Sequence, residues 1–159
     1  MSRAPSTNAT RLLKQAGMAF TEHLYRYEEH GGTRVSAEAL GVPEHAVIKT
    51  LVMEDERGAP LIILMHGDRE VSTKELARQI GAKAVQPCQP ELANRHSGYL
   101  VGGTSPFGTK KAMPIHAEAG IFDLDRIYLN GGSRGFLVGM DPKELERVLQ
   151  IKRVSVAIS

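Results

Sequence analysis

A glycine-rich stretch, residues 98–111, has the residue types best suited to forming a ligand pocket. It starts with the apolar residues 99–101, which predict a short strand, and continues through Gly102 and Gly103 to Pro106 and two lysines. Adjacent glycines let backbone groups approach a ligand, and the proline limits the conformations of the loop. The pattern favours a rigid pocket wall lined by backbone groups, with positive charge at its exit. An ordinary strand-to-loop turn has the same composition and is the alternative.

A single lysine, Lys49, interrupts the apolar run of residues 47–53. Because burying an unpaired ammonium group is costly, this charge must meet either water or an anion. In the first case Lys49 is a solvent-facing strand residue. In the second case its ammonium points into a pocket, where it could bind a phosphate or stabilise a developing oxyanion.

Spacing argues against several other kinds of chemistry. The glycine pair is not followed by the Lys-Ser/Thr of a phosphate-binding loop, and neither Ser105 nor Ser133 stands in a G-x-S-x-G motif. No two of the six histidines have the close spacing of a zinc site, so each is interpreted as a surface or packing residue and no metal or cofactor is expected. Cys88 lies between two prolines and is interpreted as inert, although a catalytic thiol is the alternative.

Length and composition predict one globular domain. The chain has 159 residues, 42% of them hydrophobic and 24% charged, with a net charge of +2. Its one cysteine excludes an internal disulfide, and it has neither an apolar run long enough to span a bilayer nor a signal peptide. We therefore expect a cytoplasmic protein without a membrane partner, with a flexible N-terminus over residues 1–7 and a single domain over residues 8–159.

Short helices and strands are predicted to alternate irregularly, which favours an α+β fold with a mixed, mostly antiparallel, barrel-like sheet. Ser36 is predicted to cap one helix, and Pro114 favours an edge position for its strand. Residues 48–53 and 61–65 predict a β-hairpin. The predicted helices cover residues 8–16, 36–40, 72–80 and 91–96, with a last one opened by residues 141–144. The other predicted strands cover residues 20–25, 84–85, 111–115, 126–129, 136–138 and 153–158.

Three segments, residues 47–51, 97–108 and 127–135, resemble the YbaK/EbsC family, which includes the editing domain inserted in bacterial prolyl-tRNA synthetases. The resemblance covers nearly the whole chain in the same order. It implies a single α+β domain that clears wrongly charged tRNA. In that family, YbaK-type members hydrolyse cysteine from tRNA(Pro). Prolyl-tRNA synthetase attaches cysteine by mistake because cysteine and proline are close in size, and binding energy alone cannot prevent this error.

The resemblance also implies roles for individual residues. Lys49 would contact the 3′-terminal nucleotide and position the ester. Gly102 opens a G-x-x-x-P motif that would line the aminoacyl pocket with backbone groups, and Tyr25 would lie nearby. The substrate's own thiol would attack its carbonyl, so the protein would supply orientation and backbone dipoles. Further substrate-binding residues implied in this way are Gly103, Thr104, Ser105, Pro106, Gly131 and Arg134.

One position departs from the family pattern. Leu137 stands where close relatives carry an acidic residue, so the role of that acid cannot be carried over. Three functions stay open: a trans-editing deacylase, a non-catalytic module that holds tRNA ends or nucleotides for a partner such as prolyl-tRNA synthetase, and a ligand-sensing domain without an RNA role. The first two predict a basic rim formed by Lys49, Lys110, Lys111 and Arg134.

Overall fold

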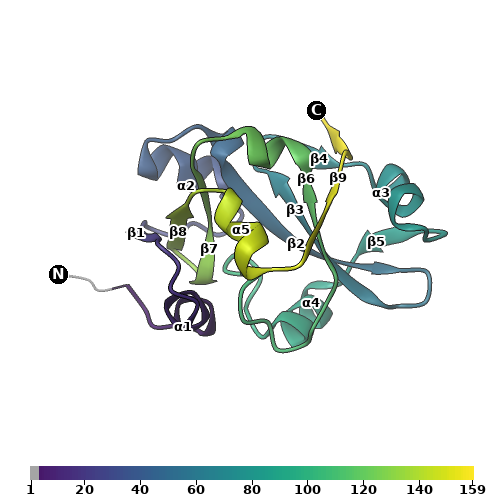
Figure 1. Cartoon of the computed structure of the whole chain (residues 1–159), viewed down its shortest axis with the longest axis horizontal. Helices are drawn as coiled ribbons and strands as arrows, with labels where there is room; N and C mark the ends of the chain where they lie inside the picture. The colour runs from purple at the N-terminus through teal and green to yellow at the C-terminus, as the bar shows by residue number, and fades with distance from the viewer. Residues whose placement is uncertain (1–3) are drawn as a thin grey trace.

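The centre of the fold is an eight-stranded mixed sheet, shown in Figure 1. The computed structural model describes residues 4–159. Along the sheet lie, in order, β1 (Thr21–Leu24), β8 (Phe136–Met140), β7 (Ile127–Ser133), β2 (Val47–Asp55), β3 (Pro60–His66), β6 (Ile115–Glu118) and β9 (Ile151–Val154), and β5 (Val85–Pro87) pairs with β2.

Antiparallel pairings predominate in this sheet. The pairs β1–β8, β7–β8, β2–β3 and β2–β5 are antiparallel, whereas β2–β7, β3–β6 and β6–β9 are parallel. A second sheet pairs β4 (Glu70–Val71) with β10 (Ala157–Ile158), so the last strand supports the turn that follows β3. The predicted α+β fold with a mixed, mostly antiparallel sheet is confirmed.

Local capping signals define the helices. The Ser72 side chain accepts from Glu75 N at the start of one helix, and Gly81 ends it in the left-handed conformation. Residues 1–7 were predicted to be flexible, and residues 1–3 of this segment lie outside the described residues. Thr7 caps the first helix, and its hydroxyl donates to the carbonyl of Gly131 at 2.5 Å. The helices are α1 (Asn8–Gln15), α2 (Gly32–Leu40), α3 (Thr73–Ile80), α4 (Pro90–Ser97) and α5 (Lys143–Val148).

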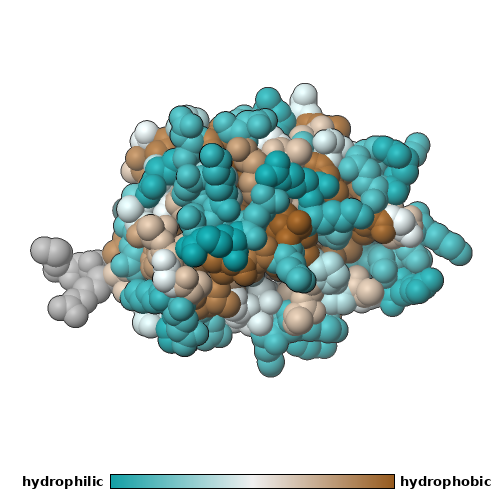
Figure 2. Space-filling view, viewed as in Figure 1, coloured by the Kyte–Doolittle hydropathy of each residue, from teal (hydrophilic) through white to brown (hydrophobic). Residues whose placement is uncertain are grey.

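Strand β3 runs through the hydrophobic core. Its residues 61–65 are at most 4% exposed, because the strand lies between β2 and β6 and is covered on both faces. Ile62 and Leu64 pack into one core cluster, and Ile63 and Met65 pack into another. Figure 2 shows a face on which hydrophilic side chains predominate, with hydrophobic ones between them near the middle. Within residues 4–159, the helices are too short or too polar to cross a membrane.

The predicted strand at residues 99–101 is wrong, because this segment forms a tight turn. Gly98 ends α4 with φ 80°, and Gly103 N donates to the carbonyl of Leu100 at 2.8 Å. Leu100 and Val101 are 58% and 44% exposed, whereas Tyr99 is buried and its hydroxyl donates to the carbonyl of Phe107 at 2.6 Å. The apolar run therefore supplies one anchor residue and two surface residues.

Three other element predictions are wrong in position. Ser36 does not cap α2 but lies inside it and donates to the carbonyl of Thr33 at 3.1 Å. Strand β6 begins after Pro114 and lies inside the sheet between β3 and β9. The carbonyl of Pro114 still accepts from Ile62 N, so the sheet tolerates the missing N–H at that point. The single strand predicted over residues 153–158 is divided between β9 and β10.

Candidate active site

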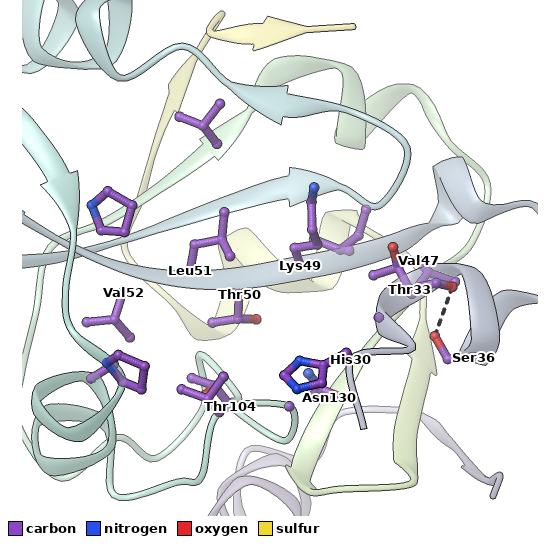
Figure 3. A pocket seen from close by; sticks show the side chains of 18 of the residues that line it. His30, Thr33, Ser36, Val47, Lys49, Thr50, Leu51, Val52, Thr104 and Asn130 are labelled. Atoms are coloured by element: carbon purple, nitrogen blue, oxygen red, sulfur yellow. Dashed lines mark hydrogen bonds between the residues drawn. The ribbon is translucent and has the colours of Figure 1, made fainter. Parts of the chain in front are cut away.

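Within residues 4–159, part of one edge of β2 has no neighbouring strand, and the candidate site lies there. On one side, β3 pairs with β2 from Ile48 to Glu54. On the other side, β7 pairs only with Val47 and Ile48, and β5 pairs only with residues 53–55. A pocket of about 590 Å³ opens at this gap, as Figure 3 shows. The edge of the strand therefore forms part of the pocket wall.

The backbone N–H and C=O groups of Thr50 point toward the gap, because those of successive β2 residues face alternate edges of the strand. The carbonyl of Val47 accepts from Gly67 N on the β3 side, at 2.7 Å. The carbonyl of Val52 faces the opposite edge, where it accepts from Cys88 N at 3.1 Å. Because backbone groups of alternate strand residues face alternate edges, the N–H and C=O of Thr50 also face that edge. Thr50 thus offers the pocket one backbone donor and one backbone acceptor.

The pocket wraps around this edge and reaches both faces of β2. Successive strand side chains point to opposite faces, so Lys49 lies on one side and Thr50 on the other. Figure 3 shows His30, Thr104 and Asn130 on the Thr50 side. A ligand in this pocket can therefore meet an ammonium group on one side of the strand and uncharged polar groups on the other.

Lys49 lines the pocket and its ammonium is anchored to the turn after β3. Its Nζ donates to the carbonyl of Arg69 at 2.5 Å and lies 3.5 Å from Oε1 of Glu70. The Lys49 side chain is 18% exposed and that of Glu70 is 73% exposed, so the ion pair itself contributes little stability. The ammonium keeps further donor capacity that a ligand could use.

The turn that anchors Lys49 is itself fixed by polar contacts. The Thr33 hydroxyl donates to Oε2 of Glu44 at 2.7 Å, and its oxygen also lies 3.2 Å from the carbonyl oxygen of Gly67. His45 Nδ1 and Asp68 Oδ1 lie 2.7 Å apart. These contacts connect the turn to the start of α2 and to the residues just before β2, so the position of the Lys49 anchor is well defined.

Gly102 lines the pocket in a conformation that favours glycine. Its φ is +98°, and a Cβ there would lie 2.6 Å from the hydroxyl of Tyr27. Gly103 does not line the pocket but allows the loop to pack against the β7–β8 hairpin, since a Cβ there would lie 2.8 Å from Arg134 N. Thr104 lines the pocket and is 5% exposed.

Arg134 lies at the rim, outside the pocket lining. Its Nε donates to the carbonyl of Val101 at 3.0 Å, and its guanidinium carbon lies 5.2 Å from the centre of the Tyr27 ring. This arrangement connects the β7–β8 hairpin, the glycine loop and the segment after β1. The terminal guanidinium nitrogens of this exposed residue can still meet a phosphate.

Three further predicted site residues have structural contacts and do not line the pocket. Ser105 is fully buried, and its hydroxyl accepts from Phe107 N at 3.2 Å. Pro106 is buried beside it. The carbonyl of Gly131 accepts from Thr7, and a Cβ on Gly131 would lie 2.5 Å from the Phe136 ring. The structure thus brings Tyr25, Lys49, Gly102 and Thr104 to one pocket, while the other predicted residues support its walls or rim.

Burial raises the pKa of two potentially reactive groups in the pocket lining. Burial raises the pKa of the Cys88 thiol, and the charge of Glu54 adds to this effect. Burial also raises the pKa of the half-buried Tyr25 phenol. A thiol with a raised pKa is a poor nucleophile.

Among the described residues there is no group of three or more His, Cys, Asp and Glu side chains placed to hold a metal ion.

Sequence reasoning missed several lining residues, of which Thr50 is the most informative. Thr50 is 8% exposed, and its buried Oγ1 has no hydrogen-bond partner within residues 4–159. A buried hydroxyl without a partner is costly, so a side-chain rotation that brings the hydroxyl to a ligand in the pocket would relieve that cost. Its position directly after Lys49 was the available signal. His30, Tyr27 and Asn130 also line the pocket, and no spacing rule singled them out. Leu137, at the position of the family acid, is 2% exposed and lines the pocket as an apolar residue.

Comparison with known families shows what class of protein this fold and pocket define. Residues 30–148 match the aminoacyl-tRNA editing domain, and the chain belongs to that family. The resemblance inferred from the three sequence segments is thereby confirmed.

Individual relatives agree with this assignment. EbsC of Enterococcus faecalis, which carries the provisional name of a Cys-tRNA(Pro)/Cys-tRNA(Cys) deacylase, is 29% identical over 140 residues, covering 87% of this chain and 85% of EbsC. The proline–tRNA ligase of Thermodesulfovibrio yellowstonii is 33% identical over 89 residues, which are 56% of this chain and 15% of the ligase. A solved structure described as a candidate trans-editing enzyme for prolyl-tRNA synthetase has a TM-score of 0.85 at 20% identity, covering 98% of this chain and 100% of that one.

Proposed function

We propose that this protein is a trans-editing deacylase that hydrolyses the ester of mischarged aminoacyl-tRNA, with Cys-tRNA(Pro) as the expected substrate and prolyl-tRNA synthetase as the enzyme whose errors it corrects. The observation that carries the proposal is the pocket around the open edge of β2, with Lys49 on one face and Thr50, Gly102 and Thr104 beyond it. Family membership and the similarity to EbsC support the same reaction.

The two faces of β2 suggest which part of the substrate binds on each side of the strand. The terminal nucleotide lies on the Lys49 side, where the ammonium meets a phosphate or ribose oxygen. The ester crosses the open edge beside the backbone of Thr50, and the aminoacyl group occupies the side that carries Thr104. A pocket of about 590 Å³ lies within the usual range for small-ligand sites, and it accommodates more than an amino acid side chain alone.

The chemistry requires no protein nucleophile. Ser105 is fully buried and Cys88 is held as a thiol, so neither is suited to attack the ester. The cysteine sulfur of the substrate, once deprotonated, attacks the ester carbonyl carbon. The C–O bond to the ribose then breaks, the tRNA leaves with a free hydroxyl, and the cysteine leaves as a thiolactone that water opens. The protein contributes by orienting the ester and by directing backbone dipoles at the developing oxyanion.

A single-turnover deacylation panel with Cys-, Ala-, Ser- and Pro-tRNA(Pro) tests this proposal. Cys-tRNA(Pro) should be cleaved fastest and Ser-tRNA(Pro) slowly, because a hydroxyl is a much weaker nucleophile than a thiol. Fast serine cleavage would identify water as the attacking group. Salt-dependent binding of tRNA without cleavage of any substrate would instead support the non-catalytic module, whose phosphate contacts lower affinity as salt rises.

A further inference from the structure

His30 has an unusual backbone conformation for its residue type. Within residues 4–159 it is the one non-glycine residue with a positive φ, at 61°. The left-handed region is uncommon for residues other than glycine, although histidine enters it more readily than most. Such conformations persist where the surrounding structure fixes them, and they cluster at functional sites.

The segment around His30 fixes this conformation from both sides. Gly31 N donates to the carbonyl of Glu28 at 3.0 Å, closing a turn around His30. A Cβ on Gly31 would lie 2.7 Å from Cγ2 of Val35, so only glycine fits there without rearrangement. The next residue, Gly32, also has a positive φ, at 62°, and begins α2. The two glycines thus direct the chain so that the side chain of His30 projects from the turn.

The imidazole of His30 is directed to the pocket. It is part of the pocket lining, and Figure 3 shows it on the Thr50 side of β2, in the region of Thr104 and Asn130. The ring has no hydrogen-bond partner among the described residues, so both of its nitrogens are available to a ligand. The other titratable side chains that line the pocket are Tyr25, Tyr27, Glu28, Lys49, Glu70 and Cys88.

We propose that His30 is the proton acceptor of the deacylation reaction, an inference that rests on the function proposed above. Neutral imidazole removes the proton from the attacking thiol as the sulfur–carbon bond forms. The imidazolium then gives this proton to the ribose oxygen as the ester C–O bond breaks, so the histidine is unchanged at the end. Histidine is the side chain most often used for such proton transfers near neutral pH.

Two variants separate this chemical role from the backbone role of the residue. Asparagine also enters the left-handed region, so His30→Asn should keep the turn but cannot accept a proton at neutral pH. Its single-turnover rate with Cys-tRNA(Pro) should fall about 10²-fold or more, within the usual range for loss of a general base. The pH dependence that the histidine contributes to the wild-type rate should disappear. His30→Gly should be equally slow and should recover activity when imidazole is added. His96→Asn, which alters a histidine outside the pocket, is the control.

Three outcomes would overturn the inference. The first is a His30→Asn variant with a near wild-type rate. The second is a slow variant whose pH profile has the wild-type shape. The third is a His30→Gly variant that imidazole does not rescue although its thermal unfolding midpoint is unchanged. If instead the wild-type protein cleaves none of the four aminoacyl-tRNAs, the proposed function fails and the inference fails with it. A cleaving wild type with an unaffected His30→Asn overturns the inference alone.

Discussion

At the scale of single residues, the best-defined contacts in the pocket belong to Lys49. If Lys49 contacts the terminal nucleotide as proposed, Lys49→Ala should lose most deacylase activity, because it removes an ammonium group from the pocket lining. Lys49→Arg should restore activity only in part, since a planar guanidinium does not reproduce the contacts of a compact ammonium with the carbonyl of Arg69. The measurement is single-turnover deacylation beside a thermal unfolding curve.

Glu70→Gln is the matched control for Lys49. It removes the exposed partner of the ion pair but leaves the Arg69 contact, so activity should change little and stability by no more than about 1 kcal/mol. A Lys49→Ala protein that unfolds at the wild-type temperature and still turns over at the wild-type rate would remove Lys49 from the mechanism.

Thr50 gives a prediction in which activity and stability change in opposite directions. Thr50→Val replaces the hydroxyl, which has no partner among the described residues, with a methyl group of similar shape. Stability should rise, by up to about 1–3 kcal/mol, because a buried polar group without a partner is removed. If the hydroxyl turns into the pocket to meet the substrate, deacylation should slow, because valine cannot supply that contact. Urea unfolding and single-turnover rates are the two measurements, and a variant with unchanged activity would show that the hydroxyl does not contact substrate.

At the scale of elements, the loop that carries Gly102 packs directly against Tyr27, in the segment that follows β1. Gly102→Ala should slow deacylation more than it weakens tRNA binding, since losing one well-placed donor typically costs about 10²–10³ in rate. The new methyl group would lie 2.6 Å from the Tyr27 hydroxyl, and a non-glycine residue at φ +98° is strained.

The double variant Gly102→Ala/Tyr27→Phe distinguishes the two causes. Removing the Tyr27 hydroxyl eliminates the closest contact, so rates should recover in part if the clash displaces the loop, while the backbone strain remains. Tyr27→Phe alone is the control. An equal loss of binding and catalysis in Gly102→Ala would reduce Gly102 to a structural turn residue.

Elements with local signals could be predicted from the sequence, and those fixed by tertiary contacts could not. The helix from Ser72 to Gly81 was predictable because its cap and its left-handed end involve neighbouring residues. The turn at residues 99–101 was not, because its conformation depends on Tyr99 reaching Phe107. The same distinction applies to the site. Lys49 was visible as a charge in an apolar strand. Thr50 and His30 were not, because they line the pocket through tertiary structure: β5 and β7 leave part of β2 uncovered, and the turn before α2 brings His30 to the same pocket.

At the scale of the whole molecule, buried histidines couple stability to pH. Burial lowers the pKa of His66 and His116 below the ordinary value of 6.5. In acid the unfolded chain therefore binds protons more readily than the folded protein. Their contribution to stability is fully present above about pH 6.5 and is lost as the pH falls toward the lower folded-state pKa values.

The thermal unfolding midpoint should therefore decrease below about pH 6.5. His116→Leu and His116→Gln should both make this decrease shallower, because neither side chain titrates in this range, even if they differ in stability at neutral pH. His116 lies outside the candidate pocket, so deacylation at neutral pH should be little affected. A decrease as steep as that of the wild type in both variants would show that His116 does not contribute.

The short gap along β2 also bears on how such a protein avoids aggregation. An unpaired strand edge is a template on which a foreign strand can add, and proteins usually cover or charge such edges. Here the gap runs only from the β7 pairing at Ile48 to the contact of Val52 with Cys88, roughly 13 Å at the usual rise per residue. A strand of ordinary length could not dock there without displacing β5 or β7, whereas a small ester can. The fold can therefore leave backbone hydrogen-bonding groups open to a ligand while excluding another polypeptide from the same edge.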